Sequence, residues 1–315
     1  MKKIFVMAVL AAGLAGCNRS PEFYFKRANY LMSSGKEAEA LANYNKALLL
    51  QSRFPEALTA RGLLFEKQGD VQKAGMDYRR AIEQNSSYLP AYNNLGSMLM
   101  DSGSYREAVE LFTKALDVKP DYPYALLNRG LALYKLGNCA SAVPDLSRAL
   151  QLNPRFTMAY YHRALCSRNA GNVPDEISDL DRVLELDPAA VMARYERGQA
   201  LYKLGDYPGA SEEFSKAAAL KPDNPAYAYA QAIAAYKGGD LQNALSYAGN
   251  AAKLRPDSYQ AYGLMGDICA GLGLKDEAKV HYRDAASRAP QYAKVYQSRA
   301  AALDAPAPRR KASRR

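Results

Sequence analysis

Small and apolar residues recur along this chain every 34 positions. Counted from Pro21, eight blocks of this length follow one another without an insertion or a deletion and end at Tyr292. Position 8 of the block is Gly or Ala throughout, and positions 20 and 27 are alanine in seven blocks each. Position 24 carries large side chains such as Tyr44, Tyr78 and Phe112. The spacing of these positions predicts two helices in each block, which approach closely at the small residues.

The turn between the two helices has its own pattern. Position 15 is glycine in all eight blocks, which predicts a left-handed residue that ends the first helix. Position 16 has a short polar side chain in six blocks, and we expect it to cap the second helix. These residues are Asp70, Ser104, Asn138, Asn172, Asp206 and Asp240. Proline at position 32 ends the second helix in the last six blocks.

A helix-turn-helix unit of 34 residues with this pattern resembles the tetratricopeptide repeat, or TPR. The resemblance covers 272 of the 315 residues and implies an all-α fold, a right-handed superhelical solenoid of eight repeats. The repeats span residues 21–54, 55–88, 89–122, 123–156, 157–190, 191–224, 225–258 and 259–292. No repeat can bury its apolar faces alone, so neighbours must stack. Residues 293–304 are expected to form a C-terminal capping helix.

Two further positions change together. Where position 7 is arginine, position 23 is acidic in four blocks, and in the first block Arg27 faces Asn43. The other three blocks lack both the arginine and the acid. We therefore predict structural ion pairs between the two helices of one repeat: Arg61 with Asp77, Arg129 with Asp145, Arg163 with Asp179, and Arg197 with Glu213. Glu176 stands where the other repeats have a packing alanine, and we expect it to reach solvent or a cation such as Arg163.

In the TPR family, positions 2, 5, 6, 9, 12 and 13 of the first helix line the concave face. The resemblance therefore implies a partner-binding groove with amides in repeats 3 and 4, tyrosines in repeats 4 to 7, and a basic edge. Its candidate residues are Asn93, Asn94, Asn128, Tyr134, Lys135, Tyr161, His162, Arg168, Tyr195, Tyr202, Lys203, Tyr229, Tyr236 and Lys237. Tyrosine offers a large contact area at small entropic cost, which suits an extended peptide. The alternative is that Tyr and Lys are ordinary features of the repeat at these positions.

The N-terminus has the order of a secretory signal. Two lysines precede an apolar run of 11 residues, Ile4 to Leu14, which is too short to span a bilayer. The run ends in Leu-Ala-Gly-Cys, which resembles the bacterial lipobox. The resemblance implies a signal peptide over residues 1–16, acylation of Cys17 and a lipidated tether over 17–20. Asn18 favours the outer membrane, facing the periplasm. The alternative is an ordinary signal peptide with an incidental cysteine.

Charge is concentrated at the ends of the chain. The formal net charge is +10, but the two N-terminal lysines and five cations in the last seven residues leave +3 for everything between. A nucleic-acid-binding protein would present a basic face on the fold itself, so we expect no nucleic-acid partner. Residues 305–315 are predicted to form a disordered basic tail, which could contact an anionic surface.

Candidate catalytic chemistry is missing from the sequence. It has no phosphate-binding loop, no paired metal-ligand spacing and no nucleophile elbow, and His162 and His281 lie in different repeats. We therefore predict no enzyme, no cofactor and no metal. Cys139 and Cys166 lie in adjacent repeats, which leaves open whether they form a disulfide or are small packing residues.

Together these features predict a lipid-anchored scaffold in the bacterial cell envelope. It is expected to bind envelope proteins or peptide segments in its concave groove, and to be held on the bilayer through acylated Cys17. The resemblance to TPR lipoproteins leaves two alternatives. One is a pilotin-like factor that assembles type IV pilus secretins, and the other is a module that binds peptidoglycan or another glycan.

Overall fold

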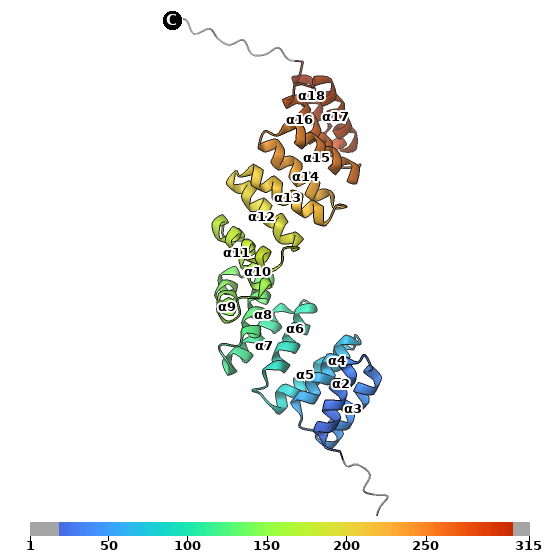
Figure 1. Cartoon of the computed structure of the whole chain (residues 1–315), viewed down its shortest axis with the longest axis vertical. Coiled ribbons are helices and arrows are strands. Elements are labelled where there is room, and N and C mark those ends of the chain that lie inside the picture. Colours follow the sequence, from blue (N-terminus) through green and yellow to red (C-terminus); the bar gives the residue numbers. More distant parts are fainter. Residues whose placement is uncertain (1–18, 305–315) are drawn as a thin grey trace, which may run out of the picture. The chain divides into compact units, whose positions relative to one another are not determined.

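The computed structural model describes residues 19–304. The predicted signal peptide, Cys17 and the basic tail lie outside the described residues, so the structure does not bear on them. The chain divides into two compact units, Met1–Ala159 and Tyr160–Arg315, and the division falls within helix α10. Each unit is built from pairs of antiparallel helices that follow the 34-residue register (Figure 1). The fold is therefore all-α, as the repeat pattern predicts.

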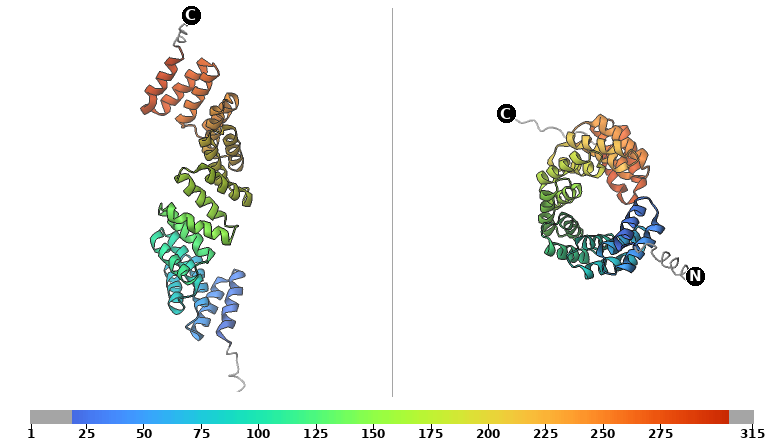
Figure 2. Two further views of the ribbon diagram at one scale, coloured as in Figure 1. Left: turned by 90° about the vertical axis from the view of Figure 1, so that its left-hand side faces the viewer. Right: turned by 60° about the horizontal axis from the view of Figure 1, so that its bottom comes forward.

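In the first unit, the two helices of each repeat are followed directly by the next pair, and successive pairs pack against each other (Figure 2). These helices are α2 (Pro21–Ser33), α3 (Glu37–Leu50), α4 (Pro55–Lys67), α5 (Val71–Gln84), α6 (Leu89–Asp101), α7 (Tyr105–Val118), α8 (Pro123–Lys135) and α9 (Cys139–Leu152). Ser20, the last residue of the predicted tether, caps α2 by accepting a hydrogen bond from the Phe23 amide at 3.3 Å. The first repeat thus begins at once after the tether.

The second unit continues the same order. Its helices are α10 (Thr157–Asn169), α11 (Val173–Leu186), α12 (Val191–Leu204), α13 (Tyr207–Leu220), α14 (Pro225–Lys237), α15 (Leu241–Leu254), α16 (Tyr259–Gly271), α17 (Lys275–Arg288), the 3₁₀ turn η1 (Pro290–Tyr292) and α18 (Ala293–Ala302). Helix α18 packs on the last repeat through Tyr296, whose ring stacks on Tyr282 with 6.3 Å between centroids. It covers the apolar surface that a ninth repeat would otherwise bury.

Every turn glycine at position 15 adopts a left-handed conformation, with φ between 73° and 85°. At Gly205, for example, φ is 84°, and the amide of Asp206 donates a hydrogen bond back to the Leu201 carbonyl at 3.0 Å. A Cβ on Gly205 would meet no atom within 4 Å, so glycine is required by the backbone conformation alone and not by space. The turn is therefore set locally, before any packing between repeats.

Five of the six predicted caps are present. The side chains of Asp70, Asn138, Asn172, Asp206 and Asp240 each accept a hydrogen bond from the backbone amide three residues ahead. The prediction is wrong for Ser104, whose side chain makes no such bond at the start of α7.

The small residues lie where the helices of one repeat touch. The alanines at position 20 are fully buried, and so is Glu176 in the fifth repeat. Position 8 faces position 24, so a Cβ on Gly96 would lie 2.5 Å from the Phe112 ring and one on Gly62 would lie 2.6 Å from the Tyr78 ring. Glycine and a large ring are therefore a matched pair, and each alone would leave a clash or a void.

Within residues 19–304, no helix is both long and apolar enough to cross a bilayer. The described cysteines differ in state. Cys269 is a buried free thiol, whereas Cys139 and Cys166 are disulfide-bonded.

Candidate functional site

The position 7 arginines reach their acidic partners within the same repeat. Arg61 meets Asp77 at 2.7 Å, Arg129 meets Asp145 at 2.7 Å and Arg163 meets Asp179 at 2.6 Å. In all three pairs the Nε and Nη2 atoms of the guanidinium bind the two carboxylate oxygens, the geometry that makes such pairs strong and specific. The hydrogen bonds to Asp145 raise the pKa of Arg129.

The same arginines also bind the preceding repeat. The free Nη1 of Arg61 donates to Asn45 at 2.6 Å, and that of Arg129 donates to Thr113 at 3.2 Å. Both acceptors lie at position 25 of the repeat before. An arginine at position 7 therefore fills the space between two successive second helices and joins them.

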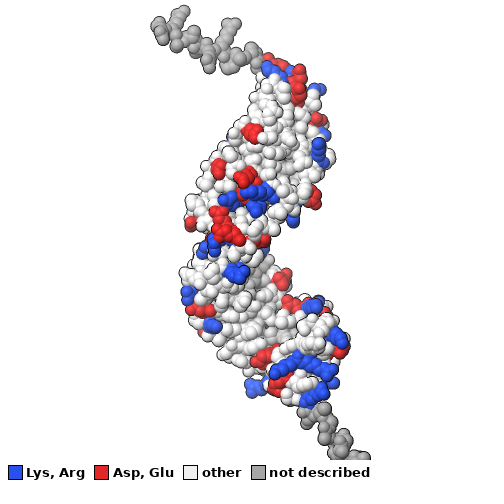
Figure 3. Space-filling model, viewed as in Figure 1, with Lys and Arg blue, Asp and Glu red and all other residues white. Residues whose placement is uncertain are grey.

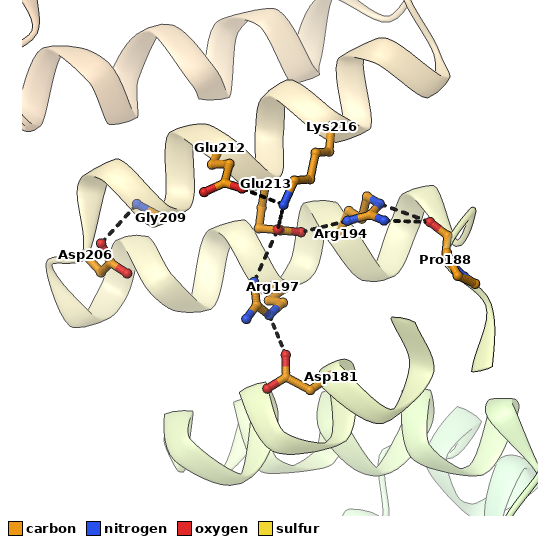
Figure 4. A network of polar contacts seen from close by, with 9 residues as sticks. All are labelled: Asp181, Pro188, Arg194, Arg197, Asp206, Gly209, Glu212, Glu213 and Lys216. Carbon is orange, nitrogen blue, oxygen red and sulfur yellow. Dashed lines mark hydrogen bonds and ion pairs between the residues drawn. The ribbon is translucent and has the colours of Figure 1, made fainter. Parts of the chain in front are cut away.

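In the sixth repeat the ion pair becomes a network (Figure 4). Glu213 is buried and receives Arg197 at 3.3 Å, Arg194 at 3.4 Å and Lys216 at 3.0 Å. Arg197 also binds Asp181 of the fifth repeat at 2.5 Å. These charges pair with one another across two repeats, so the network holds the fifth and sixth repeats together.

The partner of Glu176 differs from the predicted one. Glu176 is fully buried, so it does not reach solvent, and Arg163 is engaged with Asp179. Its cation is Arg168, which lies 2.7 Å from Glu176 and 2.6 Å from Glu196. Burial opposes the charge of Arg168, but the two carboxylates outweigh it and raise its pKa. Arg168 was predicted as a groove residue from its position in the repeat. It lies instead in a buried triad with Glu176 and Glu196, because Glu176 is an acid that the other repeats lack at that position.

Four of the predicted groove residues come together in one cleft. The cleft has a volume of about 520 Å³ and lies on the first helices of repeats 6 and 7. It is lined by Tyr195, Gln199, Tyr202, Lys203, Phe214, Ala226, Tyr229, Ala230 and Ile233. Apart from Phe214, all of them occupy the first-helix positions expected for a groove.

The walls of this cleft, which we call the tyrosine cleft, are held by packing. The Tyr195 ring lies 5.5 Å from Phe214 and 5.2 Å from Tyr227, so its orientation is fixed from two sides. Burial raises the pKa of Tyr229, which keeps its hydroxyl neutral and able to donate a hydrogen bond. Lys203 is exposed at the edge. The arrangement offers flat apolar surfaces with hydroxyls and one cation, which can hold an apolar side chain and part of its backbone.

The other predicted groove residues do not line the tyrosine cleft. In the first unit, Asn128 donates a hydrogen bond to Asn93 at 2.8 Å, so part of their bonding capacity is used within the protein, and Asn94 is half-buried nearby in sequence. In the second unit, His162 is buried with its ring edge-on to Tyr161 at 5.4 Å. Of the remaining candidates, the tyrosines are half-buried and the lysines exposed: Tyr134, Tyr236, Lys135 and Lys237.

Sequence reasoning missed five residues of the cleft. Gln199, Ala226, Ala230 and Ile233 occupy positions 9, 2, 6 and 9, so the same positional rule would have found them. Phe214 lies on a second helix and reaches the cleft past Gly198, where a Cβ would come within 2.6 Å of its ring. In the described part of the chain, no three His, Cys, Asp or Glu residues come together as a metal site.

The comparisons with known proteins agree with this architecture. The tetratricopeptide repeat family matches residues 129–188, 177–225 and 229–293, which make up more than half of the chain. Further TPR matches cover residues 28–69, 96–137 and 55–88. The chain therefore belongs to the TPR family, whose members are protein-interaction scaffolds. A search of curated protein sequences finds no match.

Several solved structures share the fold. YrrB, described as a TPR protein with an unusual peptide-binding site, is 26% identical, with 60% of this chain and 97% of YrrB covered at a TM-score of 0.53. PilF of Pseudomonas aeruginosa is 22% identical, with 69% and 97% covered at a TM-score of 0.57. PilW, described as a type IV pilus biogenesis factor, is 22% identical, with 65% and 96% covered at a TM-score of 0.57. The likeness to PilF and PilW shows the fold alone.

Proposed function

We propose that this chain is a lipid-anchored adaptor of the bacterial cell envelope that binds a peptide segment of a partner protein in the tyrosine cleft. The observation that carries the proposal is the convergence of Tyr195, Tyr202 and Tyr229 on one cleft at the groove positions of adjacent repeats. A rigid aromatic wall with hydroxyls can bury an apolar side chain and hydrogen-bond the backbone beside it. The role is binding and not catalysis.

The test of the cleft is an affinity capture from envelope membranes with identification of the bound proteins. The variant Tyr195→Ala/Tyr229→Ala is expected to lose specific partners that the unaltered protein retains. Tyr30→Ala is the matched control, because Tyr30 is 70% exposed and belongs to the first unit, whereas the cleft residues belong to the second. An unchanged set of partners in the cleft variant would refute this site.

The lipid anchor is a separate part of the proposal and rests on the sequence order from Met1 to Cys17. Labelled palmitate should be incorporated into the unaltered protein, and Cys17→Ser should abolish the label and release the protein from the membrane fraction. Separation of inner and outer membranes then tests the outer-membrane assignment that Asn18 favours. A labelled Cys17→Ser protein would contradict acylation at this residue.

A second candidate function is assembly of type IV pilus secretins. PilW, which shares the fold, is described as a type IV pilus biogenesis factor, and this motivates the candidate. Deletion of the gene would then abolish secretin multimers and leave cell-wall turnover unchanged. Normal multimers in the deletion strain would reject this candidate and leave the general adaptor function in place.

A further inference from the structure

Two of the three repeats without an arginine at position 7 have a cleft beside that position. In repeat 3 the position is Leu95, and a cleft of about 320 Å³ lies between α5, α6 and α7. In repeat 7 it is Gln231, and a cleft of about 370 Å³ lies between α13, α14 and α15. Both clefts lie between successive second helices, the place that Arg61 and Arg129 fill in their repeats. A cleft at the same place in the repeat is therefore found in each unit.

The two clefts differ in chemistry. The repeat 3 cleft is lined by leucine and isoleucine together with charged side chains of both signs, whereas the repeat 7 cleft is lined by hydroxyl, carboxyl and amide groups beside alanines. The latter is lined by Tyr207, Pro208, Ser211, Glu212, Ser215, Gln231, Ala234, Ala235, Gly238, Asp240 and Tyr247. A volume of 370 Å³ corresponds to about a dozen water molecules, which is room for one long side chain and part of its backbone.

Gln231 makes this cleft a candidate binding site. Its side chain lines the cleft and is only 7% exposed. Among residues 19–304 no hydrogen bond from its side-chain amide to another residue is found, whereas Arg61, Arg129 and Arg197 at the same position each bind an acidic side chain. The amide oxygen and nitrogen of Gln231 are accessible from the cleft, where a ligand can pair with them. The side-chain amide of Gln231 can therefore pair with a hydrogen-bond donor and a hydrogen-bond acceptor of a ligand in this cleft.

The charged side chains around the cleft indicate the sign of the charge that the ligand carries. Its ionisable carboxyl groups are Glu212 and Asp240, and no lysine or arginine is among the lining residues. Glu212 binds Lys216 at 2.7 Å, and Asp240 caps α15 through Asn243, but a carboxylate has about four acceptor sites and both keep free ones. The rings of Tyr207 and Tyr247 can flank a cation, and Ala234 and Ala235 offer an apolar surface for an aliphatic stem.

We propose that the repeat 7 cleft binds an arginine or lysine side chain presented by a basic peptide segment of a partner polypeptide. The cationic head takes the place of the missing position 7 arginine, next to Glu212 and Asp240, and the amide of Gln231 pairs with the polar groups of the incoming segment. This site is separate from the tyrosine cleft. Tyr229 and Ile233 of α14 line the tyrosine cleft, and Gln231 and Ala235 of the same helix line this one.

The test uses the full mature chain in detergent and two capped peptides, acetyl-Ala-Arg-Ala-amide and acetyl-Ala-Gln-Ala-amide. Binding is followed by NMR of the glutamine side-chain amides and by titration calorimetry. The variant Gln231→Arg/Tyr247→Asp installs the arginine and acid of the other repeats and so closes the cleft with a pair that the fold already uses. The matched control is Leu95→Arg/Leu111→Asp, which closes the repeat 3 cleft in the other unit. Circular dichroism confirms that both variants are folded.

The arginine peptide is expected to bind and to shift the Gln231 amide signal. The repeat 7 variant should weaken its binding by about tenfold or more, as for the loss of a hydrogen bond to a charged group, and the repeat 3 variant should not change it. Equal binding of the glutamine peptide would overturn the cationic ligand. Binding of chitotriose in place of the peptide would assign the cleft to a glycan. Tighter peptide binding after removal of residues 305–315 would assign it to the chain's own tail and refute the partner segment. The tyrosine cleft variant should leave this binding unchanged.

Discussion

The buried triad of Arg168, Glu176 and Glu196 allows a quantitative prediction. Glu176 is fully buried and Glu196 is 9% exposed, and both carboxylates meet the one guanidinium of Arg168. The variant Arg168→Met keeps most of the side-chain volume but removes the cation. It strands two buried carboxylates, so we expect a loss of at least about 3–5 kcal/mol of stability, the cost found when one partner of a buried ion pair is removed.

Removing the acid Glu176 in place of the arginine is expected to change the stability little. Glu176→Ala installs the alanine that the other seven repeats have, and Arg168 keeps Glu196 at 2.6 Å. We expect a change within about 1 kcal/mol, because a buried charge pair often contributes little beyond its own desolvation cost. The double variant Arg168→Met/Glu176→Ala leaves only Glu196 stranded and should fall between the two single variants.

The assay is native-state hydrogen exchange of the amides in α11 and α12, because a repeat array can open locally without a single global transition. A loss of about 3–5 kcal/mol accelerates exchange by roughly two to four orders of magnitude in Arg168→Met. The reasoning is refuted if Arg168→Met exchanges no faster than Glu176→Ala, since Glu176 would then not depend on the guanidinium.

Three further changes test the turn, the packing and the titration. Gly205→Ala forces a Cβ into a residue with φ of 84° and should cost about 1–2 kcal/mol by urea denaturation, with no change in binding at the tyrosine cleft. Gly96→Ala drives a Cβ to 2.5 Å from Phe112 and should cost about 1–3 kcal/mol, and the further change Phe112→Leu should restore part of it. Burial raises the pKa of Tyr44 to about 12 from an unfolded value near 10, so its contribution is complete below pH 10 and is lost as the pH rises through 12. Tyr44→Phe, which removes the hydroxyl that donates to Asn29, should flatten this alkaline loss; an unchanged alkaline transition would assign it to another group.

Much of the fold could be predicted because the repeat shows the same physical requirement eight times. A glycine that recurs at one position, Gly205 among them, indicates a backbone conformation, and the structure has the left-handed turn there. The joint change of positions 7 and 23 indicated contact in the same way, and Arg129 and Asp145 lie 2.7 Å apart. A contact that recurs in many repeats can therefore be predicted from the sequence alone.

Relations that occur once could not be predicted in this way. Glu176 departs from its column in one repeat, so no second example indicated which cation would meet it, and the sequence pointed to Arg163 where the structure has Arg168. The cleft at Gln231 is also a single case. The sequence shows that the arginine is missing, but whether neighbours collapse into the space depends on the positions of α13 and α15. The sequence likewise did not predict which groove tyrosines line the same cleft, because this depends on how they pack around Phe214.

The position 7 arginines also determine how strain passes along each unit. Arg61, Arg129 and Arg197 tie a repeat to the one before it, so a pull on one second helix is transmitted to the next through a short charged link. The arginine is absent at Leu95, Gln231 and Met265, where repeat 3 follows repeat 2, repeat 7 follows repeat 6 and repeat 8 follows repeat 7. The first unit therefore has one junction without this link and the second unit has two, and at these junctions the stack can bend or begin to open under load. Figure 3 shows where acidic and basic side chains gather on one face of the molecule. An envelope adaptor pulled between a membrane and a partner would yield first at these junctions.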